Sequence, residues 1–401
     1  MGVFTPPWLL PLTSDPTLAI RREIDLIEFL DRLGYDEAWI GEHHSGGMEI
    51  IGSPELIVAA AAERTRRIRL GTGVISLPFH HPLTVADRIV QLDHQTRGRA
   101  MFGFGPGLLP GDAHMFGVPA QQQRARMAES LDIVIRLLDG ATVTRQAGPH
   151  TLRDARLQLG PYTRPRPELA VASAVTPSGG RLAGRYGIGM LCLAAATGPG
   201  YSVLDVNWAN ALAAAEEHGQ VMDRSALRLV APFHLAPTRD QAIREVEAGF
   251  RRWARHADRV IEGGPATVGY ADFETFLASD GVTVGTPADA VAALARYWDK
   301  SGGFGAILNQ ITHFADDEAS RRSHLLLIDQ VMPAFTARCG PRLASHDWSG
   351  AHRTTWFGDT FRAAEAEIRK HLDGGRASGD PPESGIGPGG NPGVGPGIGT
   401  S

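Results

Sequence analysis

The sequence predicts an α/β fold in which strands and helices alternate and close into a (β/α)8 barrel, the TIM barrel. Strand-like and helix-like segments alternate four times within residues 1–138, at about 35 residues per unit, which is the length of a βαβ unit. No hairpin signal interrupts these units, so we expect parallel strands with right-handed crossovers. Four more strand-like segments follow. Because periodicity does not show closure, a doubly wound open sheet is the alternative.

The units of the first half have clear start and stop signals. Asp15 and Pro16 form an N-cap followed by proline at the first helical position, and Gly34 is a typical stop. Apolar residues at helical spacing lie between these signals. The expected strands are residues 2–5, 37–41, 69–77 and 100–105. The expected helices are residues 15–33, 53–64 and 123–138, and a helix that begins at Pro82.

The second half is less regular, and we expect insertions in it. Residues 142–159 alternate around a Gly-Pro turn and predict a hairpin, and residues 263–285 form an irregular insertion. The remaining barrel strands are expected at residues 169–173, 189–194, 227–235 and 306–310. Residues 373–401 contain 11 Gly and 5 Pro. This composition predicts a barrel domain over residues 1–372 and a disordered Gly/Pro-rich tail over residues 373–401.

Composition excludes several classes of protein. The 401-residue chain is 43% hydrophobic, which suffices for a large core, and its net charge is −5 without a polybasic block. Nucleic acid and anionic membranes are therefore not expected partners. Cys192 and Cys339 form no CxxC pattern, which excludes a disulfide framework. Neither a long apolar stretch nor a secretory signal is recognisable, so we expect a cytoplasmic protein.

Active sites of such barrels lie at the carboxyl ends of the strands, which makes Glu42, His43 and His44 the first candidates. Histidine titrates near neutral pH, so this group can form a general acid/base centre, and an ordinary solvated turn is the alternative. Metal binding is a second alternative because His80, His81 and His114 also occur. Adjacent histidines point in different directions and no HExxH spacing is present, so no metal is expected.

Two further strand ends are candidates for binding a ligand. Residues 103–107 (GFGPG) fail the dinucleotide fingerprint GxGxxG, and they either let the backbone approach a flat ligand or form a tight turn. Residues 176–180 (TPSGG) open a helix, where free amides and hydroxyls can hold an anion with help from Arg124. An ordinary N-cap and a surface arginine are the alternative. Apolar residues near the strand ends line either a substrate pocket or the core: Leu77, Phe79, Phe104, Leu108, Leu109 and Met115.

Three ordered motifs resemble the bacterial luciferase-like flavin-dependent monooxygenases, above all the limonene 1,2-monooxygenase-type members. They are GEHHSGG (41–47), RLGTGVISLPFHHPL (69–83) and LDHQTRGRAMFGFGPG (92–107). The resemblance is dense over residues 1–140 and thinner to about residue 335. It implies a barrel that uses reduced FMN, supplied by a separate flavin reductase, and O2. A C4a-peroxyflavin then inserts one oxygen atom into an apolar organic substrate, by epoxidation, hydroxylation or Baeyer–Villiger oxidation.

The resemblance also implies roles for individual residues. His43 matches the family's active-site histidine, with His44 as the next candidate, and Glu42 matches the acid that supports the turn after the third strand. Gly73 and Val74 match the pair whose unusual peptide bond lies against the flavin ring. The remaining matches are cofactor-binding positions, with Arg124 on the phosphate: Gly105, Arg124, Ser173, Thr176, Ser178 and Gly179. The family usually forms homodimers.

The sequence departs from the luciferases proper at Gly105 and Pro106, where those proteins carry Cys-Arg. One phosphate-binding arginine is therefore missing, and light emission is not expected. Part of the superfamily uses the deazaflavin F420 for reduction instead of FMN for oxygenation. An F420-dependent oxidoreductase is thus an alternative. A non-catalytic flavin-binding partner subunit and a metal-dependent barrel hydrolase are two more.

Overall fold

Eight parallel strands close into a barrel in the computed structural model, which describes residues 1–6, 8–193, 195 and 197–377. Around the barrel the strand order is β1-β12-β9-β8-β7-β4-β3-β2. The closed barrel is confirmed, and the alternative of an open sheet is wrong. The barrel strands are β1 (Gly2–Thr5), β2 (Glu37–Ile40), β3 (Arg69–Ser76), β4 (Ala100–Gly105), β7 (Glu168–Ser173), β8 (Gly189–Cys192), β9 (Leu227–Ala231) and β12 (Ala306–Gln310).

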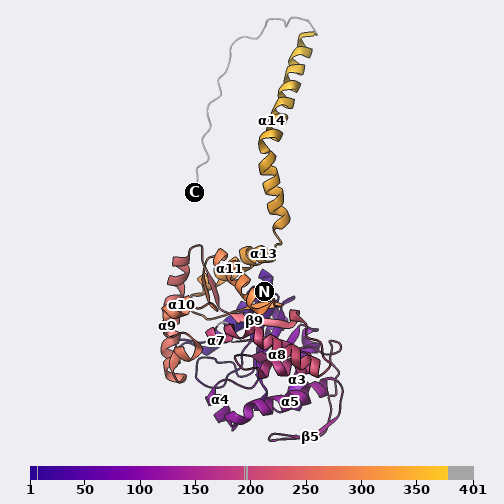
Figure 1. Cartoon of the computed structure of the whole chain (residues 1–401), viewed down its shortest axis with the longest axis vertical. Coiled ribbons are helices and arrows are strands. Elements are labelled where there is room, and N and C mark those ends of the chain that lie inside the picture. Colours follow the sequence, from indigo (N-terminus) through magenta and orange to yellow (C-terminus); the bar gives the residue numbers. More distant parts are fainter. Residues whose placement is uncertain (7, 194, 196, 378–401) are drawn as a thin grey trace. The chain divides into compact units, whose positions relative to one another are not determined.

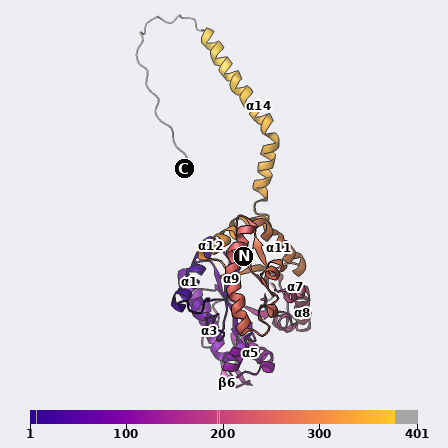
Figure 2. The ribbon, with the colours of Figure 1, turned by 90° about the vertical axis from the view of Figure 1, so that its left-hand side faces the viewer.

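Helices cover the outside of the barrel (Figure 1). The helices that follow barrel strands are α1 (Pro16–Leu33), α2 (Pro54–Arg64), α3 (Pro82–Thr96), α5 (Gln123–Leu138), α6 (Ser178–Tyr186), α8 (Leu204–Glu217), α11 (Pro287–Ser301) and α12 (Asp317–Leu326). Figure 2 shows α1 and α3 on one flank and α8 and α11 on the other. The expected caps form: Asp15 accepts the backbone N–H groups of Thr17 (2.7 Å) and Leu18 (3.2 Å). Gly34 ends α1 with a φ of 91°, which favours glycine.

Shorter or additional helices fill the connections. They are η1 (Leu77–Phe79), α4 (Pro110–Met115), η2 (Ala120–Gln122), α7 (Gly198–Ser202), η3 (Arg224–Ala226), α9 (Arg239–Val260), η4 (Gly264–Val268), α10 (Phe273–Ala278), η5 (Leu327–Val331) and α13 (Met332–Phe335). The predicted hairpin is confirmed as the antiparallel pair β5 (Val143–Ala147) and β6 (His150–Ala155). The short helix α4 is not predicted from the sequence. It supplies Asp112 to the site described below.

The single strand expected over residues 227–235 is wrong, because the chain divides there into two strands. β9 stays in the barrel, whereas β10 (Phe233–Leu235) leaves it and pairs in parallel with β11 (Thr283–Gly285). Pro232 lies between the two strands and has no N–H to donate to a ladder. At this break, the side chain of Asn309 accepts a hydrogen bond from the backbone N–H of Phe233 at 2.8 Å.

The insertion after β9 carries an aromatic core of its own. Its buried aromatic residues are Phe250, Trp253, Tyr270, Phe273, Phe276 and Phe314. Trp8, from the segment after β1, stacks on Trp253 with ring centroids 6.1 Å apart and contacts Phe314 at 5.8 Å. The N-terminal segment is therefore fixed against the insertion.

A buried network of charges closes the amino-terminal end of the barrel. Arg228 is 2% exposed and donates to both carboxylate oxygens of Glu37, at 2.6 and 2.7 Å. It also pairs with Glu168 at 2.6 Å, and Glu168 pairs in turn with Arg69. The indole of Trp39 donates to Glu37 at 2.9 Å and lies beneath the Arg228 guanidinium. These contacts join β2, β3, β7 and β9 across the barrel axis.

The chain divides into two compact units, the first being Met1–Arg338 and the second beginning at Cys339. Sequence analysis expected the barrel domain to end at residue 372, where the Gly/Pro-rich composition begins. Residues 340–377 form the helix α14 within the second unit, so the helix includes Asp373, the first residue of the expected Gly/Pro-rich tail. The rest of the expected tail, residues 378–401, lies outside the described residues. No helix within the described part has the length and apolarity that a membrane crossing needs.

Candidate active site

A cavity of about 540 Å³ opens at the carboxyl ends of the barrel strands, where a site is expected in this fold. One end is lined by glycine backbone and apolar groups: Phe4, Gly41, Gly73, Val74 and Gly105. The other end is lined by hydroxyl and basic groups: Arg124, Thr176, Ser178, Arg181, Arg185 and His218. Glu42 and His43 also line the cavity. One cavity therefore combines glycine backbone and apolar groups with hydroxyl and basic groups.

The glycine-lined end of the cavity is built by β3 and β4. The peptide bond between Gly73 and Val74 is cis, and the pairing of β3 with β4 shifts register between Thr72 and Ile75. A Cβ atom on Gly105 would lie 2.5 Å from the Cγ2 atom of Val74, so a larger residue at 105 requires Val74 to shift. Gly73, Val74 and Gly105, which the resemblance implies as cofactor-binding positions, all line the cavity.

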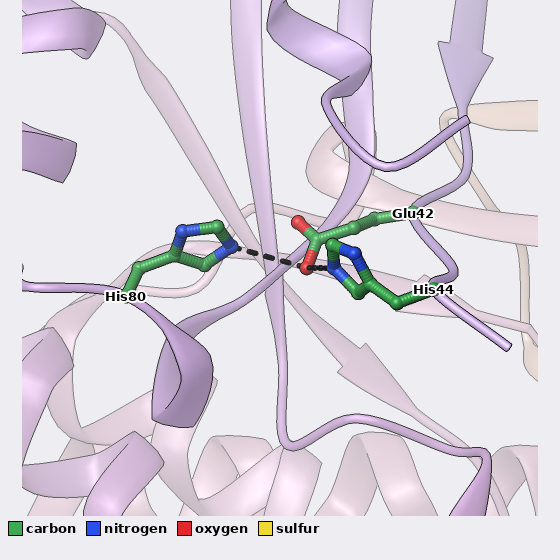
Figure 3. Close-up of side chains that lie close together, drawn as sticks. All are labelled: Glu42, His44 and His80. Atoms are coloured by element: carbon green, nitrogen blue, oxygen red, sulfur yellow. Dashed lines mark hydrogen bonds and ion pairs between the residues drawn. The ribbon is translucent and has the colours of Figure 1, made fainter. Parts of the chain in front are cut away.

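Glu42 is the centre of a buried hydrogen-bonded cluster (Figure 3). Its Oε1 atom lies 3.1 Å from His44 Nε2 and 3.1 Å from His80 Nε2, and its Oε2 atom accepts the backbone N–H of Ser76 at 3.2 Å. Burial by itself raises the pKa of the Glu42 carboxyl, but the hydrogen bonds from His44 and His80 outweigh burial and lower this pKa. An ionised Glu42 therefore holds the end of β3, which carries the cavity wall.

His44 lies behind the cavity wall and is not among its lining residues in the described chain. Its ring packs edge-on against Phe116, with centroids 4.8 Å apart, and its Nε2 atom contacts Glu42. The carboxylate of Glu42 and the Nε2 atoms of His44 and His80 lie within 4.8 Å of one another, close enough to surround a metal ion. Both rings instead satisfy the same carboxylate oxygen, so we assign the three residues to a hydrogen-bonded cluster. The absence of a metal stays a prediction.

The other histidines considered from the sequence lie elsewhere. His81 caps α3 by accepting the backbone N–H of Leu83 at 3.3 Å, and His114 is exposed on α4.

The apolar candidates differ in their burial. Leu77 and Phe104 are fully buried in the core, whereas Leu108 lines the cavity and is 81% exposed. Leu108 is thus placed at the mouth of the cavity.

His43 is held by carboxylates at both ring nitrogens. Its Nδ1 atom lies 3.1 Å from Asp112 of α4, and its Nε2 atom lies 3.1 Å from Glu49 in the loop after β2. Burial lowers the pKa of His43, but Glu49 and Asp112 outweigh this effect and raise the pKa above its ordinary value. Hydrogen bonds from His43 and Ser45 likewise overcome burial and lower the pKa of Asp112. His43 is therefore favoured as a cation at the cavity wall.

The hydroxyl and basic end of the cavity is formed by the start of α6 and by α5. The hydroxyls of Thr176 and Ser178 lie 2.9 Å apart, next to the unpaired backbone N–H groups at the start of α6. A Cβ atom on Gly179 would lie 2.5 Å from the carbonyl oxygen of Ala172, so glycine lets α6 approach β7 closely. Ser173, by contrast, is 1% exposed and is not among the cavity-lining residues of the described chain, so the structure does not bring it to the site.

Several residues of the site are not predicted from the sequence. Asp112 and Glu49 contact His43, yet Asp112 is 69 residues away in the chain, and neither belongs to a motif. Arg181 and Arg185 lie one turn apart on α6 and line the cavity. This i, i+4 spacing after the TPSGG segment is a signal that could have found the two arginines from the sequence.

The fold and the site define a (β/α)8 barrel with a cavity at the carboxyl ends of its strands, lined by glycine backbone, a histidine and basic side chains. Residues 1–304 match the luciferase-like monooxygenase family, and the chain belongs to this family. It is 41% identical to limonene 1,2-monooxygenase of Rhodococcus erythropolis over 383 residues, covering 94% of this chain and 96% of that protein. It is 43% identical to 4-hydroxyprotoasukamycin monooxygenase of Streptomyces nodosus subsp. asukaensis over 354 residues, covering 86% and 95%.

The fold also matches solved structures. The crystal structure of monooxygenase RslO1 from Streptomyces bottropensis superposes with a TM-score of 0.73 at 26% identity, covering 83% of this chain and 99% of that chain. The resemblance inferred from the three motifs is therefore confirmed, and the protein is a luciferase-like monooxygenase.

Proposed function

We propose that the protein uses reduced FMN and O2 to insert one oxygen atom into an apolar organic substrate, by epoxidation, hydroxylation or Baeyer–Villiger oxidation. The observation that carries this proposal is the single cavity, which joins a glycine-lined flat wall beside His43 to a basic, hydroxyl-lined end. A flavin mononucleotide has the same two parts, a flat ring and a phosphate. Two relatives with 41% and 43% identity are named as monooxygenases of organic substrates, which supports the same reaction class.

The residues present fit such a cofactor. The volume of about 540 Å³ lies within the usual range for sites that hold small molecules. Arg124, Arg181 and Arg185 offer guanidinium groups for a phosphate, and the start of α6 offers backbone N–H groups. Two arginines on α6 can thus replace the arginine that the luciferases carry at the position of Pro106. When bound, reduced FMN supplies the electrons that activate O2.

The protein's own residues position this cofactor and handle a proton. Glu42 holds the backbone of Ser76 and thereby the end of β3, whose Gly73 and Val74 line the ring end of the cavity. His43 lies at the same wall, where it can hold or donate a proton during the reaction. Leu108 at the mouth and Val74 deeper in provide apolar contact for a substrate and help to exclude water.

The proposed cofactor is tested by the melting temperature of the cofactor-free protein under anaerobic conditions. FMNH2 at 100 times its Kd should stabilise the protein by about 2.7 kcal/mol, and Tm should rise accordingly. F420H2 at the same concentration should raise Tm less, because the two relatives at 41% and 43% identity are named as monooxygenases. A larger rise with F420H2 would favour the alternative of an F420-dependent oxidoreductase. A rise with FMNH2 but no oxygenated product from any apolar substrate would favour a non-catalytic flavin-binding subunit.

Arg124→Ala should weaken FMN binding by about 1.5–3 kcal/mol, the range for a hydrogen bond to a charged group. Riboflavin binding should weaken far less, since riboflavin has no phosphate. Calorimetric titration with both ligands measures the difference. Arg126→Ala is a matched control on the same helix, because Arg126 contacts Gln122 and is not among the cavity-lining residues of the described chain. Equal losses for FMN and riboflavin in Arg124→Ala would remove Arg124 from the phosphate site.

Three finer points stay predictions that rest on the resemblance. They are the supply of reduced FMN by a separate flavin reductase, a homodimeric assembly and a cytoplasmic location. Co-purification with a reductase, light scattering and cell fractionation address them in turn.

A further inference from the structure

We propose that Glu49 is a positioning residue that works with Asp112 to fix the imidazole of His43 by both of its ring nitrogens. The inference rests on the proposed function only in that His43 serves the reaction. Glu49 accepts a hydrogen bond from Nε2 of His43, and Asp112 accepts one from Nδ1.

The geometry restrains the ring from two directions. Asp112 comes from α4, after β4, and Glu49 comes from the loop after β2, so the two carboxylates lie at opposite nitrogens of one ring, each at 3.1 Å. A ring flip would carry both nitrogens away from their acceptors. Asp112 is itself fixed, because its Oδ1 atom accepts the N–H of His44 at 3.1 Å and the hydroxyl of Ser45 at 2.5 Å.

Glu49 is fixed in turn by the N-terminal segment. Its Oε1 atom accepts the indole N–H of Trp8 at 3.1 Å, which leaves Oε2 for His43. The backbones of Trp8 and Glu49 form an antiparallel bridge, and the N–H of Leu9 donates to the carbonyl oxygen of Met48 at 2.8 Å. Because Trp8 stacks on Trp253 of α9, contacts run without a gap from the aromatic core of the insertion through Trp8 and Glu49 to His43.

The charges agree with this role. The carboxylates that face His43 are Glu49, Asp112 and, further away, Glu42. Burial and the nearby Asp112 charge raise the pKa of Glu49 above its ordinary value, and His43 and the Trp8 indole offset only part of this rise. A largely buried carboxylate is costly unless it is paired, so Glu49 and the His43 cation stabilise each other. Because the Glu49 carboxylate lies 3.1 Å from His43 Nε2, removing its charge should change the titration of His43.

The test is an NMR titration of the His43 ring in the cofactor-free, full-length protein. Glu49→Gln retains the size of the side chain and an oxygen for Trp8 but removes the charge. The pKa of His43 should fall by about one unit or more, because the loss of a neighbouring negative charge disfavours the cation. Glu245→Gln is the matched control, since Glu245 pairs with His234 at 2.8 Å. That control should change the titration of His234 and leave His43 as it was.

Trp8→Phe provides a second variant in case Glu49→Gln unfolds. It keeps the aromatic packing, removes the hydrogen bond to Glu49, and should lower the pKa of His43 by a smaller amount. An unchanged His43 titration in the folded variants would overturn the proposal. If the titration shifts while His43 proves dispensable for turnover, the proposed function fails and the role of Glu49 stands.

Discussion

Replacing His43 by alanine should reduce product formation by about 10²–10⁴-fold, the usual contribution of a general acid or base. The variant should still bind reduced FMN, because binding depends on the flat wall and on the arginines at the far end of the cavity. Reduced flavin should then be consumed with release of hydrogen peroxide instead of product. Product, peroxide and Tm measured on the same variant separate a chemical role from a structural one.

His114→Ala is the control for His43→Ala, since His114 is exposed on α4 and makes no contact with the cavity. Its coupling of flavin oxidation to product should match the wild type. If His43→Ala loses thermal stability but keeps coupled turnover, His43 only packs in the rim of the barrel. His44 would then be a poor substitute in the mechanism, because it lies behind the wall and satisfies Glu42.

Arg228→Ala should lower the free energy of unfolding by about 3–5 kcal/mol, the range for breaking a buried ion pair on one side. The loss is large because Glu37 would remain buried without its cation, and the contact with Glu168 would vanish as well. Urea unfolding followed by circular dichroism measures the change. Arg251→Ala breaks an exposed pair with Glu247 on α9 and should have little effect. Equal stability of Arg228→Ala and the wild type would mean that the network does not close the barrel.

The same network gives this prediction a pH dependence. Burial raises the pKa of Glu37, but the hydrogen bonds and charge of Arg228 outweigh burial and lower this pKa. A lowered carboxyl pKa contributes stability that is fully present above the ordinary value of about 4.5 and is lost as the pH falls through the folded-state pKa. Wild-type stability should therefore fall in acid more steeply than that of Arg228→Ala. A parallel fall in both proteins would show that Glu37 does not depend on Arg228.

Most elements of the fold follow from local signals in the sequence. Asp15 and Gly34 fix the ends of α1 through contacts with near neighbours, so the sequence alone predicts this helix. The break at Pro232 could not be predicted locally, because the residues that stabilise it, Asn309 and Thr283, lie far along the chain.

The site divides in the same way. Glu42, His43 and Gly105 lie at or just after strand ends, which the barrel rule gathers into one place, whereas Gly73 and Val74 lie within β3 and were implied by the resemblance. Asp112 instead comes from the short helix α4 and Glu49 from the loop after β2, and they reach His43 only through the folded chain. Ser173 illustrates the opposite error, since a strand-end position does not decide which face of the strand a side chain occupies.

The close approach of Gly105 to Val74 couples two positions of the cavity wall. A Cβ atom at residue 105 would lie 2.5 Å from the Cγ2 atom of Val74, so a larger residue at 105 requires the Val74 side chain to shift. A substitution at either position therefore changes the wall at the other. An engineered larger residue at 105 is best combined with a smaller residue at 74.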